Sequence, residues 1–226
     1  NSPVPNSIAP AAVVAKAAGM AGLTTDSNIL VYDDNKNMDS SRLYWTLKFY
    51  GHKGDIRIVS GGLQALSSAG MEIVKGIESA PEQTYSTSTG DMSMLATTAD
   101  ISQNMDNPSD DFVLIDVRTD EEYNAGTIPG AIHINFEKNN FDYRTMRTVQ
   151  QIRMLYKENG IMPEDSIVMY CKTSIRAANT YASLYNAGYR NLKIYDGAWL
   201  EWSGSDKPVY KPEVNLPTVT IQQDNS

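Results

Sequence analysis

The stretch "IVMYCKTSIRAANTYASLYNAGYRNLKIYDGAWLEW", residues 167–202, decides the fold. It begins with an apolar strand pattern that ends at Cys171, and it continues as a helical pattern that stops at Gly188. A second strand pattern follows and leads into the turn at Gly197. A strand, a loop, a helix and another strand in this order predict an α/β fold, a mainly parallel sheet flanked by helices on both faces.

Residues 30–62 repeat this unit, with one extra residue in the first loop. The alignment pairs helix and turn positions of the two copies: Leu47 with Leu184, Gly51 with Gly188 and Gly61 with Gly197. It also sets Asp33 opposite Cys171. Because an ordinary core position rarely accepts an ionised carboxylate, we expect this position to lie at a loop edge.

The second copy is complete, whereas the first copy starts late. "FVLIDVR" (112–118), the turn "GTIPGA" (126–131) and a helical pattern over 148–160 precede the repeated unit in the second copy. Nothing before residue 28 matches these opening strands, so we expect the first copy to need a missing N-terminal part, on a longer precursor or a separate piece. The predicted organisation is as follows: half of a first domain (1–77), a linker and crossover (78–100), a complete second domain (101–212) and a C-terminal tail (213–226).

Composition restricts the classes of function. The chain has 226 residues and a formal net charge of −8, which argues against nucleic acid as a partner. No apolar stretch approaches the roughly 20 residues of a membrane span. One cysteine and two histidines, His52 and His133, make a metal site a poor prediction. The start of the chain lacks a signal-peptide pattern, which favours a cytoplasmic location. Export stays open, because the N-terminus looks truncated.

The loop after Cys171 predicts a site for a small anion. A parallel strand delivers Cys171 to the carboxyl edge of the sheet, where sites of open α/β sheets lie. The backbone N–H groups that lead into the next helix form a nest for an anion, and the helix dipole adds to it. With Lys172 and Arg176 nearby, we expect a nucleophilic thiolate. The alternatives are a cysteine that is only a buried core residue, or a catalytic Cys–His pair. His133 lies in a strand pattern, so we interpret it as a structural residue.

The motifs "LIDVRTDEEY", "GTIPGAIHI", "VMYCKTSIR" and "YDGAWLEW" together resemble the catalytic domain of the tandem-domain rhodaneses, the thiosulfate and mercaptopyruvate sulfurtransferases. Residues 31–65 look like the second half of the family's non-catalytic N-terminal domain, which commonly has Asp where the active domain has Cys. This chain departs from the family in carrying Thr127 where His is usual. It also lacks a longer insert before the GTIPGA turn, which could alter substrate access.

The resemblance implies sulfur transfer through a covalent Cys171 persulfide, without a cofactor or a metal. Cys171 would take sulfur from a small anionic donor, thiosulfate or mercaptopyruvate, and an acceptor thiol or cyanide would remove it. The remaining residues of the loop would bind the substrate: Lys172, Thr173, Ser174, Ile175 and Arg176. Their amides would hold the terminal sulfur, and the two cations would bind the donor's oxyanion end. The basic residue after the cysteine favours thiosulfate as the donor.

Two rival functions remain open. A cysteine phosphatase or arsenate reductase of the same fold would also hold an anion between Cys and Arg, but its loop has five intervening residues, whereas this chain has four, 172 to 175. A persulfide carrier or sensor would form the same persulfide without turnover.

Residues outside the loop have weaker signals. Asp116 follows a strand and is expected to bond loop amides or Arg118, while Arg118 is open between an ion-pair scaffold and a substrate contact. Tyr195, Trp199 and Trp202 are expected in the core or the turn. The acidic run 120–122 is expected to be a solvated helix start.

Overall fold

The computed structural model describes residues 4–76, 79–142 and 144–213. The later part of the chain builds a five-stranded sheet in the order β3-β7-β6-β4-β5, and every neighbouring pair is parallel. The strands are β3 (Leu95–Ala96), β4 (Phe112–Asp116), β5 (Ile132–His133), β6 (Ser166–Tyr170) and β7 (Leu192–Tyr195). The predicted parallel α/β fold is therefore confirmed.

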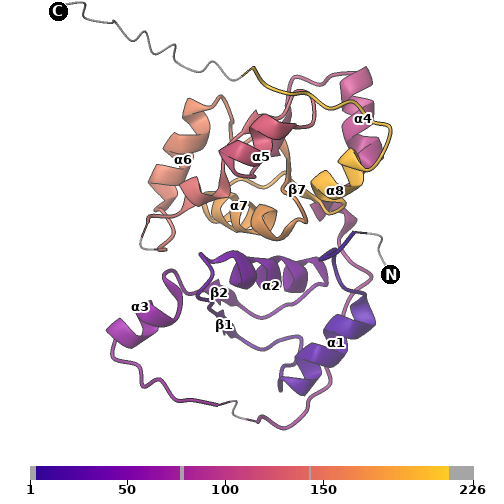
Figure 1. Cartoon of the computed structure of the whole chain (residues 1–226). Coiled ribbons are helices and arrows are strands. Elements are labelled where there is room, and N and C mark those ends of the chain that lie inside the picture. Colours follow the sequence, from indigo (N-terminus) through magenta and orange to yellow (C-terminus); the bar gives the residue numbers. More distant parts are fainter. Residues whose placement is uncertain (1–3, 77–78, 143, 214–226) are drawn as a thin grey trace, which may run out of the picture.

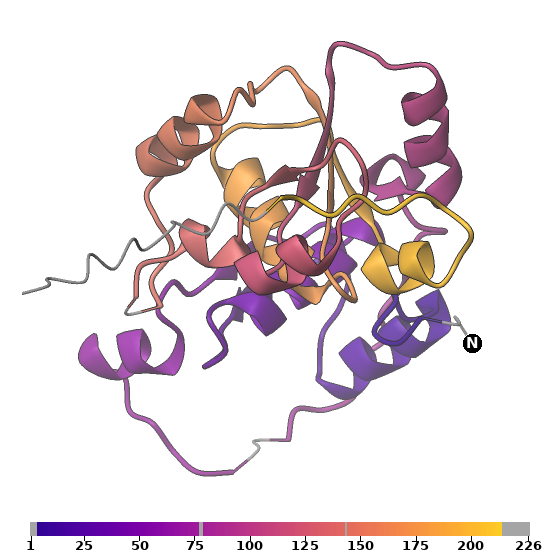
Figure 2. The ribbon, with the colours of Figure 1, turned by 45° about the horizontal axis from the view of Figure 1, so that its top comes forward.

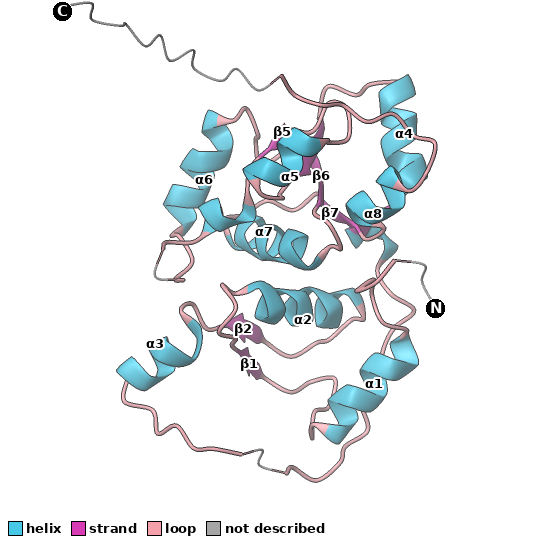
Figure 3. Cartoon of the chain, viewed as in Figure 1, coloured by secondary structure: helices cyan, strands magenta, loops and turns pink. Residues whose placement is uncertain are grey.

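Helices cover both faces of this sheet, as Figures 1 and 3 show. They are α4 (Thr98–Asp106), α5 (Asp120–Ala125), α6 (Val149–Glu158), α7 (Ile175–Asn186) and α8 (Ala198–Ser203), with short 3₁₀ turns η1 (Met92–Met94) and η2 (Phe136–Asn139). Side chains of β6 alternate between two apolar clusters: Ile167 and Met169 pack with α6 and α7, whereas Val168 packs with α4 and α8. Cys171 continues the alternation on the α7 side.

The earlier part of the chain holds a two-stranded parallel sheet, β1 (Ile29–Val31) and β2 (Ile56–Ile58). Its helices are α1 (Ala11–Met20), α2 (Met38–Phe49) and α3 (Gly62–Ser68). The two copies share unusual backbone angles: φ is +59° at Asn37 and +70° at Ser174, the residues before α2 and α7. It is +76° at Gly51 and +99° at Gly188, after the same two helices. The repeat inferred from the sequence is thus visible in the backbone.

Helices α2 and α7 lie side by side between the two sheets (Figures 1 and 2). Trp45 and Phe49 from α2 join Tyr181 and Leu184 from α7 in one buried apolar cluster. The segment from residue 79 to η1 runs as an extended connection along the outside. Within the expected crossover, residues 95–96 form β3 in the larger sheet.

The expected boundary at 77/78 lies outside the described residues, as does the expected tail apart from Glu213. None of the helices in the described part of the chain has the length and hydropathy of a membrane span.

Candidate active site

Strand β6 carries Cys171 to the carboxyl edge of the larger sheet, directly after Tyr170. The residue is 1% exposed and faces the apolar layer beneath α7. Its carbonyl oxygen accepts a hydrogen bond from the Trp199 backbone N–H at 2.9 Å, and the next carbonyl accepts from Leu200 at 3.3 Å. The start of α8 therefore fixes the first two residues of the loop.

The loop turns into α7 at Ser174, whose backbone is left-handed with a φ of +70°. The Ser174 hydroxyl is buried and donates to the carbonyl oxygens of Tyr195 and Asp196, at 3.0 and 2.9 Å. These bonds tie the loop to the end of β7. Of the predicted substrate-binding residues, Ser174 thus has its hydroxyl engaged within the protein, and its backbone N–H is what it offers to a ligand.

The backbone N–H groups of residues 172 to 176 meet no hydrogen-bond acceptor among the described residues. The equivalent loop of the first copy uses such groups on a carboxylate. There Asp33 accepts from the N–H groups of Asn35, Asn37 and Ser40 at 2.7, 3.0 and 2.8 Å. This loop geometry holds one negative charge at the position that Cys171 occupies in the second copy.

Arg176 and Glu122 form a bidentate ion pair beside the loop, with N–O distances of 2.6 and 2.9 Å. Hydrogen bonding to Arg176 lowers the pKa of Glu122 to about 2, against the opposing effect of burial. Burial disfavours the charge on Arg176, yet its pKa is raised by Glu122 and by its interaction with Cys171. Arg176 therefore lies beside the cysteine loop in an ion pair with Glu122, while Lys172 is exposed.

Glu122 corrects an expectation from the sequence. The sequence predicts that the acidic residues 120–122 are solvated. In the structure, the Glu122 carboxylate instead pairs with Arg176, and it also completes a capping box with Thr119. The spacing Thr119-x-x-Glu122 could have indicated that this carboxylate folds back over the helix start.

Arg118 forms the ion-pair scaffold that the sequence allowed as one of its two roles. Its side chain is 2% exposed and donates to Asp116 at 2.6 and 2.9 Å and to the carbonyl oxygen of Gly126. Its guanidinium also stacks over Trp199, 4.2 Å from the ring centroid. These contacts occupy the guanidinium group in the interior of the protein, and the predicted substrate contact of Arg118 stays a prediction.

Thr127 completes the buried network around Asp116. Its hydroxyl donates to Asp116 at 2.9 Å and lies 2.7 Å from the Tyr170 hydroxyl. The Tyr170 hydroxyl donates to the same carboxylate at 2.9 Å, and burial together with that charge raises the pKa of Tyr170. The departure from the family at Thr127 thus has a local hydrogen-bonding role.

The first copy contributes residues to the site that the sequence did not reveal. Arg42 of α2 pairs with Asp196, the acid of the YDG turn, at 2.8 Å. The backbone N–H of Ile8 donates to the other oxygen of Asp196 at 2.7 Å. The Asn6 side chain reaches the Thr173 hydroxyl at 3.4 Å. The N-terminal segment therefore lies along the edge of the cysteine loop.

The histidines have structural surroundings. His133 stacks on Tyr123, and its Nε2 lies 2.9 Å from the Arg118 carbonyl oxygen. His52 lies between Tyr85 and Ser27 in the first copy. Across the part of the chain that the structure describes, no group of three or more His, Cys, Asp or Glu side chains could hold a metal ion.

The chain is similar to a known domain family and to known proteins. Residues 97–205 match the rhodanese-like domain family. The sulfur carrier protein TtuD of Thermus thermophilus is 30% identical over 206 residues, which cover 83% of this chain and 72% of TtuD. A thiosulfate sulfurtransferase of Corynebacterium glutamicum is 26% identical over 220 residues, which cover 89% of this chain and 72% of that enzyme.

Solved structures are similar in fold. EanB in complex with hercynine superposes with a TM-score of 0.79 at 22% identity, covering 92% of this chain and 56% of EanB. The anaerobic ergothioneine biosynthesis enzyme of Chlorobium limicola gives 0.78 at 22% identity, covering 89% and 55%. The chain spans little more than half the length of these two proteins. With the sequence relatives and the matched domain, these findings show that the chain belongs to the rhodanese family of sulfurtransferases.

Proposed function

We propose that this protein moves a sulfane sulfur from thiosulfate to a thiophilic acceptor through a persulfide on Cys171. The observation that supports this most is the pair of equivalent loops. One closes its N–H groups on the Asp33 carboxylate, and in the other the N–H groups of residues 172–176, which follow Cys171, have no acceptor among the described residues. A persulfide carries its negative charge on the outer sulfur. Five backbone N–H groups are therefore suited to stabilise it.

In the first step the Cys171 thiolate attacks the outer sulfur of thiosulfate. A new S–S bond forms, the S–S bond within thiosulfate breaks, and sulfite leaves with the electron pair. In the second step a thiolate or cyanide attacks the outer sulfur of the persulfide, and the Cys171 thiolate leaves. The atoms and charges balance without a further oxidant or reductant, which accords with a scheme that needs no cofactor.

The cations have separate roles in this scheme. Lys172 is exposed and has no ion pair among the described residues, so it is available to the sulfonate oxygens of an approaching donor. Arg176 is held beside the cysteine loop by Glu122, so we assign it to the charge that stays at the Cys171 position rather than to the donor's sulfonate. Lys172→Met should therefore raise the KM for thiosulfate, whereas Arg176→Met should lower kcat.

The decisive experiment follows both the product and the intermediate. Thiosulfate and cyanide should yield thiocyanate with ping-pong kinetics, and Cys171→Ser should abolish the reaction. Intact mass should rise by about 32 Da, one sulfur atom, after treatment with the donor. Normal turnover by Cys171→Ser would overturn the mechanism. Mercaptopyruvate in the same assay tests the donor, and an aryl phosphate or arsenate as substrate tests the phosphatase or arsenate reductase alternative.

A sulfur carrier is the second candidate, and the similarity to TtuD favours it. A carrier would form the same persulfide in one stoichiometric step but would pass it to cyanide or small thiols too slowly for turnover. Single-turnover loading followed by a steady-state assay separates the two. Full loading with fewer than about one turnover per minute would favour the carrier over a typical enzyme.

A further inference from the structure

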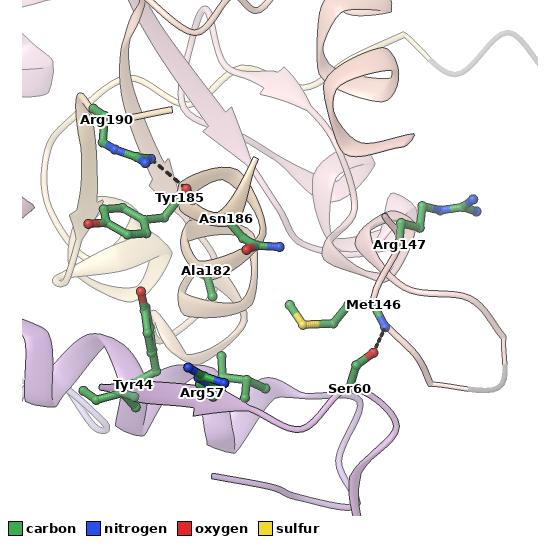
Figure 4. Close-up of a pocket in the computed structure, with 11 residues that line it drawn as sticks. Tyr44, Arg57, Ser60, Met146, Arg147, Ala182, Tyr185, Asn186 and Arg190 are labelled. Atoms are coloured by element: carbon green, nitrogen blue, oxygen red, sulfur yellow. Dashed lines mark hydrogen bonds between the residues drawn. The ribbon is translucent and has the colours of Figure 1, made fainter. Parts of the chain in front are cut away.

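A basic cavity lies between the two halves of the chain, away from the cysteine loop (Figure 4). Its volume is about 470 Å³, which is within the range of small-molecule sites. β2 and the residues after it form one side, while the C-terminal half of α7 and the segment before α6 form the other. Since the twelve residues of α7 span about 18 Å, the cavity and Cys171 lie near opposite ends of that helix.

Three arginines from three segments line this cavity: Arg57 of β2, Arg147 before α6 and Arg190 after α7. No aspartate or glutamate is among the lining residues, although the chain carries a net charge of −8. Such a gathering of positive charge on an acidic protein marks a place that attracts an anion.

The existing contacts of the arginines leave part of each guanidinium free. Arg57 pairs with Asp55 only through Nε, at 2.6 Å. Arg147 donates from Nε to the Lys138 carbonyl oxygen at 2.8 Å, its guanidinium lies over the Phe141 ring at 4.7 Å, and in Figure 4 it points away from the other lining residues. The terminal nitrogens of these two side chains meet no acceptor among the described residues. Forked guanidinium groups of this kind match the oxygens of a phosphate.

Arg190 has a second use, as a cap of α7. Its Nη1 donates to the carbonyl oxygens of Tyr185 and Tyr189, at 2.7 and 2.8 Å, which leaves Nε and Nη2 without an acceptor among the described residues. Its guanidinium lies over the Tyr185 ring, 4.4 Å from the centroid. Capping therefore uses only one of the three guanidinium nitrogens of Arg190.

Flat and apolar groups complete the lining. Tyr185 of α7 lies beside Arg190, and Tyr44 of α2 lies below it on the other half of the chain, as Figure 4 shows. Burial, with Tyr185 nearby, raises the pKa of Tyr44 to about 12, so its hydroxyl stays protonated and can donate. Ile58, Met146 and Ala182 supply apolar surface.

We propose that this cavity binds a phosphorylated ligand with a flat ring, of the nucleotide class, and that the ligand links the two halves of the chain. The phosphates pair with Arg57 and Arg190, and the ring packs against the tyrosines and the apolar wall. Ligand and cysteine loop sit at different ends of α7, so this site is independent of the proposed sulfur transfer.

Calorimetry and thermal unfolding with ATP, AMP, adenosine and inorganic triphosphate, at fixed ionic strength, test the proposal on the full chain. ATP and AMP should bind saturably and raise the melting temperature, and adenosine and triphosphate should each bind at least tenfold more weakly than ATP. Arg57→Met, at an exposed position, should weaken ATP binding at least tenfold, whereas Lys207→Met removes one exposed positive charge elsewhere and should not.

Three results would overturn the proposal: no saturable binding of ATP at millimolar concentration, equal losses in Arg57→Met and Lys207→Met, or triphosphate binding as tightly as ATP. The last result would mean that the cavity recognises charge alone. Tyr185→Leu provides a separate check, because it should weaken ATP while leaving triphosphate unchanged. Circular dichroism verifies that each variant is folded before binding is compared.

Discussion

The ion pair between Arg42 and Asp196 offers a sharp test of how the first copy supports the cysteine loop. Both side chains are mostly buried, 14% and 13% exposed, and their atoms are 2.8 Å apart. Arg42 also donates to the Asn6 carbonyl oxygen at 2.9 Å. The buried bond to the Asp196 carboxylate contributes about 1.5–3 kcal/mol, and the exposed bond to the Asn6 carbonyl oxygen about 1 kcal/mol. Arg42→Met should therefore lower the free energy of unfolding by about 3 kcal/mol.

Unfolding in urea and by heat measures this change, and a chain of this size should lose about 6–12 °C of melting temperature. The double variant Arg42→Met/Asp196→Asn completes a thermodynamic cycle, in which we expect a coupling of about 2 kcal/mol. Arg57→Met is the matched control, since the Arg57–Asp55 pair is exposed and should contribute at most about 0.5 kcal/mol.

Persulfide formation supplies an independent readout of the same pair. The Asp196 carbonyl accepts from Ser174, so a shifted YDG turn moves the cysteine loop with it. Because small displacements of a reacting group are costly, Arg42→Met should slow sulfur loading by about tenfold below its melting temperature. A coupling under about 0.5 kcal/mol with unchanged loading would refute the reasoning and leave Arg42 as a surface contact.

Three further changes have defined outcomes. Asp33→Ala should lower the free energy of unfolding in urea by about 2–4 kcal/mol, because three N–H groups lose their acceptor. Asp34→Ala, at the exposed neighbouring position, should lower it by less than about 0.5 kcal/mol. Equal losses would contradict the interpretation of this loop as an anion nest. Ser174→Ala should be less stable than Ser174→Gly by about 1 kcal/mol, since glycine tolerates the φ of +70°, and the reverse order would exclude backbone strain there. The pKa of Glu122 is depressed to about 2, so its stabilisation is complete above its unfolded pKa of 4.5 and is lost as the pH falls toward 2. With its partial exposure we expect a loss of roughly 1 kcal/mol between pH 5 and pH 2, which Glu122→Gln should remove from the pH profile of unfolding.

Local patterns predicted much of the fold. The alternation of β6 between two apolar layers and the glycines after both repeated helices follow from periodicity and turn chemistry, which are written in neighbouring residues. The alignment of Asp33 with Cys171 also needed only the order of elements. The structure explains why this position is special, because three backbone N–H groups donate to the Asp33 carboxylate.

Pairings between distant segments were beyond the sequence. Glu122 meets Arg176 across 54 residues, and Arg42 meets Asp196 across 154. Each pair depends on how separate elements pack, which a single chain does not reveal without its tertiary structure. Arg118 illustrates the same limit, because the sequence could place it at the sheet edge but could not tell that Gly126 and Trp199 would enclose it.

The two loops differ in whether their negative charge has a fixed position. In the first copy the charge is covalently part of the chain, so the loop is closed as soon as the protein folds and stays closed. In the proposed cycle the negative charge of the second loop changes position: it lies on the Cys171 sulfur before loading, on the outer sulfur of the persulfide after loading, and again on Cys171 after discharge. The order of residues 172–176 should therefore rise and fall once per turnover, while the Asp33 loop stays unchanged. Amide hydrogen exchange at residues 172–176, slow after loading with thiosulfate and fast after discharge, would follow the sulfur through the cycle, with residues 35–40 as the constant internal standard.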